Sequence, residues 1–241
     1  TELQNPGGDP VFLESHPQDA IPETERETIY FDKARMEIND PDGDTDSIWF
    51  VTNGLLVIEM ITGNRQFGDD LFIAYEPSYS NVAGDADDLH GPTYASFQGV
   101  LDAPAQSVGT LLTEQIDRYG NVTTSEAWGD YNVTVGHVDT ITEHGIAGPF
   151  WEFMNSHGLI YSDGNLLEEA LFENPFYATG RPVTEAYWSN VKVAGAQRDV
   201  LIQCFERRCL TYTPGNSEGF VVEAGNVGQH YYHWRYVQAP D

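Results

Sequence analysis

Positive charge is scarce in this sequence, which has two lysines and nine arginines against 38 acidic residues. The formal net charge of -27 opposes binding to phosphate backbones and to anionic lipid surfaces. The composition therefore predicts no nucleic-acid partner. Two interpretations of the acidity stay open, adaptation to high salt and the ordinary acidity of a secreted protein, because physiological salt screens self-repulsion beyond about 8 Å.

Long hydrophobic runs and catalytic motifs are also missing. No run of about 18 apolar residues occurs, so we expect no insertion into a membrane. Neither a G-x-S-x-G elbow nor a glycine-rich phosphate loop is present. Acidic residues are so frequent that neighbouring pairs arise by chance, and such pairs do not by themselves indicate a glycosidase. We therefore predict a protein that is not an enzyme, with a hydrolase site in residues 67–140 as the remaining alternative.

Cysteine is limited to Cys204 and Cys209. A structural zinc site would need a second pair of ligands of this kind, so none is predicted. Four residues separate the two cysteines, and a short hairpin can bring their Cα atoms to the spacing of about 5.5 Å that a disulfide needs. We predict a disulfide, with two free thiols as the alternative.

An extracellular or cell-surface location follows as an expectation from three features. Paired cysteines are typical of exported proteins. The chain begins at Thr1 without a leader, as a processed mature form would. Asn121 and Asn132 each begin an N-x-T tripeptide, the acceptor pattern for glycosylation, and are the predicted glycosylation sites.

An internal repeat organises the chain. Residues 200–214 read as two short strands folded back on one another, and residues 220–236 read as a strand end that runs into an aromatic helix. The same order occurs earlier, because 31–38 aligns with 205–212 and 51–54 aligns with 222–225. Two elements that keep register indicate a true repeat. In this alignment Tyr30 and Arg35 stand where the second copy has its two cysteines.

The predicted fold is α+β and β-rich, with two small hairpin-plus-helix modules flanking a β-strand insertion. We place an N-terminal arm and a reduced module in 1–66, the insertion in 67–140 and the second module in 141–241. Alternation on both sides of Asp32 and Lys33 predicts a hairpin at 28–38, and Gly63 is predicted to end a helix that begins near Thr52. Further patterns predict strands at 71–75, 93–100, 110–117 and 121–124, a short helix at 150–155 and a further helical turn at 166–172. The arm, 1–28, is expected to lie along the protein or a neighbour.

The second module resembles a known family. The motifs that carry the resemblance are I-x-G-x-F-W from Ile146, G-R-P-V-T-E from Gly180, the Q-x-F and L-x-Y-x-P halves of the hairpin from Gln203 and Leu210, and V-x-x-G-x-V from Val222. Together they look like the LGFP-type repeat of bacterial cell-surface proteins. The whole chain also resembles uncharacterised secreted proteins of Chloroflexi-type bacteria. The resemblance implies envelope attachment without catalysis, although Arg208 and Cys209 stand where the family hairpin has glycine.

Aromatic residues of the second module are the first candidate binding site. They come from three segments, and their convergence would form either the core of a small unit or a platform for a sugar ring or a partner protein. The candidates are Trp151, Tyr187, Trp188, Tyr232 and Trp234.

An acidic turn is the second candidate. Asp40, Asp42, Asp44 and Asp46 alternate as the opening of a calcium loop does, but Val51 occupies the twelfth position, where a bidentate acid is expected. A solvated acidic turn and a calcium site are therefore both open, and no other cofactor is predicted.

These features favour a non-catalytic structural or surface-attachment protein, with a self-assembling filament or sheath subunit as its specific form. Its expected partners are further copies of itself or components of the cell envelope. A module that binds envelope glycans is the main alternative.

Overall fold

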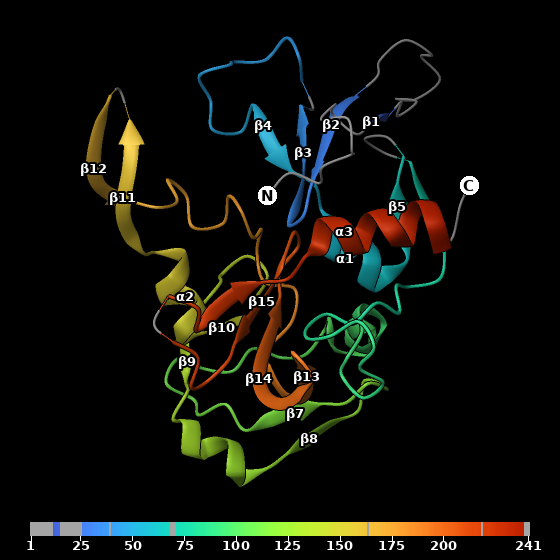
Figure 1. Cartoon of the computed structure of the whole chain (residues 1–241), viewed down its shortest axis with the longest axis vertical. Helices are drawn as coiled ribbons and strands as arrows, with labels where there is room; N and C mark the ends of the chain where they lie inside the picture. The colour runs from blue at the N-terminus through green and yellow to red at the C-terminus, as the bar shows by residue number, and fades with distance from the viewer. Residues whose placement is uncertain are drawn as a thin grey trace.

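A computed structural model describes residues 12–14, 26–38, 40–67, 71–162, 164–217 and 219–238. The fold is α+β and rich in strands, as predicted. Its strands form two larger sheets and three two-stranded ribbons (Figure 1). Most of the predicted arm lies outside the described residues. No helix in the described ranges is long and apolar enough to cross a bilayer.

The N-terminal sheet is antiparallel throughout. Its strands follow in chain order as β1 (Phe12–Glu14), β2 (Arg26–Phe31), β3 (Ala34–Ile38) and β4 (Val51–Asn53). The β2–β3 hairpin turns at Asp32 and Lys33, where the alternating sequence predicts it. Helix α1 (Leu56–Thr62) follows and ends at Gly63, which adopts the left-handed conformation with φ of 78° that favours glycine at this position.

The C-terminal sheet has six strands. Four belong to the second module: β13 (Tyr187–Val193), β14 (Ala196–Cys204), β15 (Cys209–Tyr212) and β16 (Val222–Ala224). The insertion adds the other two, β7 (Glu114–Ile116) and β8 (Val122–Thr124), through a parallel pairing of Trp188 with Gln115. Residues of the insertion and of the second module therefore share one sheet.

The two sheets repeat the same strand register. In the first copy Tyr30 pairs with Arg35 across the hairpin, and in the second Cys204 pairs with Cys209. The next pairings also correspond: Met36 with Asn53 in one copy, and Leu210 with Ala224 in the other. Helix α3 (Val227–His233) then occupies the position that α1 has in the first copy.

Each helix begins against the hairpin turn of the other copy. The amides of Val57 and Ile58 in α1 both donate to the carbonyl of Glu206, at 3.2 Å. In α3, two amides, those of Gly228 and Gln229, donate to the carbonyl of Asp32, at 3.1 and 3.3 Å. Unpaired amides at a helix start need acceptors, and here each copy supplies them to the other. The helices α1 and α3 lie side by side as a result (Figure 1).

Two hydrophobic cores lie on opposite faces of the six-stranded sheet. Along β13, Tyr187 faces the core that contains α1 and α3, and Trp188 faces the core that contains α2 (Gly148–Met154). Along β14, Ile202 faces the core that contains α1 and α3, and Leu201 faces the core that contains α2. Alternation along a strand produces this division, and it explains why these strands are apolar on both faces.

The remaining elements include two corrections to the predicted structure. Residues 93–100 were expected to form a strand, but Tyr94–Val100 is a 3-10 helix (η1) that begins with a capping box between Thr93 and Ser96. Residues 166–172 were expected to form a helical turn, but Asn165–Ala170 is strand β12, paired with β11 (His157–Ser162). The other short elements are β5 (Asn64–Gln66), β6 (Phe72–Ala74), η2 (Glu126–Tyr131), β9 (Val135–Val138), β10 (Gly145–Ala147) and the π-helical turn η3 (Trp234–Gln238).

Candidate functional site

The predicted disulfide between Cys204 and Cys209 is present. Both cysteines are buried, at 0% and 2% exposure, so the bond lies in the core and closes the β14–β15 turn. Buried disulfides of this kind stabilise a fold and take no part in exchange chemistry. The bond fixes the turn that carries Glu206, Arg207 and Arg208.

Three of the five candidate aromatic residues are core residues. Tyr187, Trp188 and Trp234 are each at most 2% exposed. The Trp188 ring contacts both Trp128 and Tyr131, with ring centroids 5.3 and 4.7 Å away, and its indole N–H donates to the Leu112 carbonyl. These three rings have no open face for a sugar.

The other two candidates are half-buried and already packed. Trp151 stacks on His137 at a centroid distance of 4.0 Å, nearly parallel. Tyr232 meets the ring of Tyr30 edge-on at 5.6 Å. Trp151 lies with the second core and Tyr232 with the first, on opposite sides of the six-stranded sheet, so the five rings do not converge on one platform.

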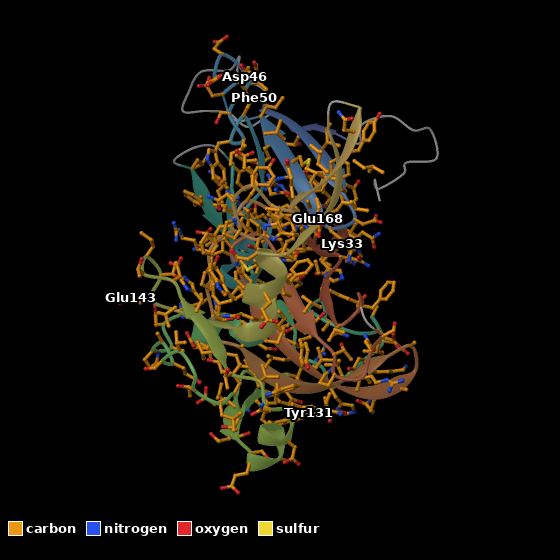
Figure 2. All side chains as sticks on the ribbon, turned by 90° about the vertical axis from the view of Figure 1, so that its left-hand side faces the viewer. Lys33, Asp46, Phe50, Tyr131, Glu143 and Glu168 are labelled. Atoms are coloured by element: carbon orange, nitrogen blue, oxygen red, sulfur yellow. A yellow bond between two sulfur atoms is a disulfide. The ribbon has the colours of Figure 1, made fainter. Side chains whose placement is uncertain are left out.

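The acidic turn is solvated. Asp40 and Asp44 accept hydrogen bonds from the amides of Asp42 and Asp46, two residues further on, which is how aspartate stabilises a turn. Asp46 lies at the outer end of the molecule, beyond the N-terminal sheet (Figure 2). Nowhere in the described ranges do three or more His, Cys, Asp or Glu side chains gather to hold a metal ion. Local turn bonds thus account for the pattern.

Both glycosylation candidates are on the surface. Asn121 is exposed and its amide donates to Asp117 at 2.9 Å. Asn132 is exposed and adopts the left-handed conformation, with φ of 52°, at the end of η2. Their accessibility is compatible with modification, which stays a prediction.

A groove of about 670 Å³ lies between residues 101–105 and 138–144. On its wall, Nδ1 of His144 lies 3.1 Å from Glu185, a buried carboxylate that also accepts the amides of Gly145 and Gln106. A histidine held by a carboxylate can move protons, and Thr140 and Thr142 add hydroxyl groups to the same wall.

Asp139, on the same wall, also has a structural explanation. Burial alone would raise its pKa, but the amides of Thr142 and Ile141 and the guanidinium of Arg181 lower it below the usual range. Its carboxylate therefore holds the 139–144 turn closed. Together with Glu185 it supports the loop that lines the groove.

Buried charges form a separate cluster inside the first copy. Arg35 is 1% exposed, and its guanidinium lies 2.5 Å from Glu37 and 3.5 Å from Glu59. Burial raises the pKa of Glu59, an effect opposed by Arg35 and by the hydroxyl of Tyr231, which donates at 2.5 Å. Desolvation offsets much of the attraction within a buried ion pair, but the loss of one partner leaves an uncompensated buried charge and strongly destabilises the fold.

The β11–β12 hairpin carries the most unusual surface. It extends away from the body of the protein (Figure 1). Leu159, Tyr161 and Leu166 share one face and are 72%, 75% and 67% exposed, and Leu167 on the other face is 41% exposed. No further strand pairs with either strand among the described residues. A two-stranded ribbon alone is marginal in water, and grouped apolar side chains mark contact surfaces.

Sequence reasoning missed this hairpin and one pocket. The pocket, of about 470 Å³, lies between the N-terminal sheet, the segment after β12 and the disulfide turn, and it includes Asn53 and Arg208. The hairpin had a local signal, the Asp-Gly dipeptide before Asn165, which favours a two-residue turn. The pocket had none, because its residues come from distant parts of the chain.

Comparison with known proteins gives no match to a family model, a curated protein or a solved structure. The LGFP resemblance therefore stays a prediction from the sequence motifs.

Proposed function

We propose that this protein is a non-catalytic, extracellular structural component that associates with further copies of itself through the β11 edge. The observation that carries the proposal is the exposed apolar hairpin, since the described residues leave its large side chains in water. The disulfide supports an oxidising compartment. A surface or envelope setting rests on the sequence resemblance alone.

The β11 edge lacks the features that protect an edge strand. Its sequence, His-Gly-Leu-Ile-Tyr-Ser, contains no lysine, acid or proline, whereas β12 carries Glu168 and Glu169. Natural sheets block unwanted pairing with charges, proline or bulges, and β11 pairs regularly with β12 over its whole length. An open, uncharged edge is a template for another strand.

A second copy of β11 fits this edge. Antiparallel pairing around a two-fold axis at Ile160 would place Leu159 opposite Tyr161 of the second copy, on the shared apolar face. Aromatic and aliphatic residues form favourable cross-strand pairs, and no like charges would face each other between the two β11 strands. The product is a four-stranded sheet in which Leu159, Tyr161 and Leu166 of both copies share one face, with Glu168 of each copy on the outer strands of that face.

Sedimentation velocity over a range of protein concentrations, in low and physiological salt, tests the proposal. We expect association that strengthens with salt, because salt screens the repulsion between chains of charge -27. Leu159→Lys should abolish it, while Leu89→Lys, at a leucine 76% exposed elsewhere, should not. A wild-type protein that stays monomeric at high concentration would overturn the proposal.

A further inference from the structure

The pocket beside the disulfide turn combines apolar walls with polar groups. Met36 and Ile48 come from the N-terminal part, and Leu171 and Phe172 from the segment after β12. Its volume, about 470 Å³, is in the range of small-ligand sites, which are mainly apolar with a few directed polar groups. The polar groups therefore decide what the pocket accepts.

Asn53 supplies an acceptor without a partner. The residue is 4% exposed, and its amide nitrogen donates to the carbonyl of Tyr177 at 3.3 Å. This contact sets the orientation of the amide, and its oxygen, Oδ1, is buried with no hydrogen-bond partner. Buried polar atoms are nearly always bonded, so an unpaired oxygen on a residue that lines the pocket points to a ligand that donates to it.

Arg208 supplies a donor without a partner. Its Nε is buried and unbonded, and no ion pair or hydrogen bond engages its guanidinium among the described residues. The neighbouring Arg207 differs, because its guanidinium donates to the Tyr177 carbonyl at 2.8 Å. Burial lowers the pKa of Arg208. In a chain with 38 acidic residues, a half-buried arginine that pairs with none of the acids in the described ranges is available for an external anion.

The internal repeat shows that the strand register requires neither side chain. Arg208 occupies the hairpin position that Ala34 has in the first copy, and Asn53 pairs at the position that Ala224 has in the second. Alanine thus serves both positions in the other copy, where the strand register is the same. The pocket thus takes Arg208 from one copy and Asn53 from the other, each at a position where the opposite copy has alanine.

We propose that this pocket binds the carboxyl end of an apolar amino acid unit. The carboxylate pairs with the guanidinium of Arg208, the adjacent N–H donates to Oδ1 of Asn53, and the apolar side chain packs against Leu171 and Phe172. Arginine matches the planar carboxylate through two parallel N–H groups. Glu173, exposed on the same lining, distinguishes two sources, because it would attract the ammonium of a free amino acid but not the amide of a peptide end.

Isothermal titration with three probes tests the inference: L-leucine, N-acetyl-L-leucine and N-acetyl-L-leucinamide. We expect at least one of the two acids to bind and the uncharged amide to bind at least about tenfold more weakly, as loss of a charged hydrogen bond implies. Preference for N-acetyl-L-leucine identifies a peptide end. Preference for L-leucine, reduced by Glu173→Gln, identifies a free amino acid.

Variants separate this site from the fold and from self-association. Arg208→Ala and Asn53→Ala should each weaken binding of the acid while thermal unfolding stays cooperative, because alanine occurs at both positions in the repeat. Arg198→Ala makes the same charge change at an exposed site and should bind as the wild type does. The inference is overturned if neither acid binds at millimolar concentration, or if Arg208→Ala binds unchanged. Sedimentation of the same variants shows whether association is affected independently.

Discussion

A Cβ atom on Gly228 would stand 1.9 Å from the carbonyl oxygen of Phe31, so α3 begins in direct backbone contact with the β2–β3 turn. The Gly228 amide donates to the next carbonyl, that of Asp32, at 3.1 Å. Gly228→Ala must therefore displace the helix from the turn. We expect the free energy of unfolding to fall by about 1–3 kcal/mol, the usual cost of overpacking, as measured by urea denaturation.

Gly99→Ala is the matched control for this substitution. Gly99 also lies in a helical turn, within η1, and a Cβ there would meet nothing within 4 Å. The free energy of unfolding of Gly99→Ala should stay within about 0.5 kcal/mol of the wild-type value or rise slightly. Equal losses in the two variants would contradict the close helix–turn contact.

The disulfide closes a turn that the first copy forms without a covalent bond, between Tyr30 and Arg35. A short closed loop restricts the unfolded chain only modestly, so Cys204→Ala/Cys209→Ala should lower the free energy of unfolding by about 2 kcal/mol. The variant should still fold, since the register does not depend on the bond in the first copy. Circular dichroism that shows an unfolded double variant at 25 °C would contradict this expectation.

Elements with strong local signals were predictable from the sequence. The β2–β3 hairpin, the end of α1 at Gly63 and the disulfide follow from alternation, a left-handed glycine position and cysteine spacing. The β11–β12 hairpin was missed because the residues of 166–170 are good helix formers. The preference of the Asp-Gly dipeptide for a tight turn outweighs this helix propensity, and Gly164 adopts a positive φ of 83°.

Contacts between distant parts of the chain could not be predicted from local sequence patterns. No local pattern indicates that Glu206 receives the start of α1, or that Asp32 receives the start of α3. The Asn53–Arg208 pocket depends on that exchange between copies. One trace of it is visible in the alignment of the repeat, where both residues replace alanine.

Arg35 is the central charge of the buried cluster. Arg35→Ala would leave Glu37 and Glu59, which are 5% and 3% exposed, without their nearest cation. Loss of one partner in a buried ion pair typically costs about 3–5 kcal/mol, and we expect a loss of this size in urea denaturation. Lys192→Ala is the control, because Lys192 meets Asp87 on the surface, where solvent screens the pair and little change is expected.

His230 makes the free energy of unfolding depend on pH in the mildly acidic range. Burial, followed by the charge of His233, lowers the pKa of His230 from 6.5 to about 4. In the unfolded chain the imidazole takes up a proton near pH 6.5, whereas in the folded protein it does so only near pH 4, so the unfolded state binds more protons in between. The free energy of unfolding should therefore fall as pH drops through this interval, by up to about 3 kcal/mol from this residue.

His230→Gln isolates this contribution from the protonation of the many carboxylates. The variant removes the titrating group next to the Tyr94 hydroxyl, which lies 3.0 Å from Nδ1. Urea denaturation at several pH values should give a shallower decline than the wild type between pH 6.5 and about 4. His90→Gln, at an exposed histidine, should keep the wild-type slope. Parallel curves for the wild type and His230→Gln would mean that the folded protein protonates His230 at its ordinary pKa, and that water reaches the ring despite its burial.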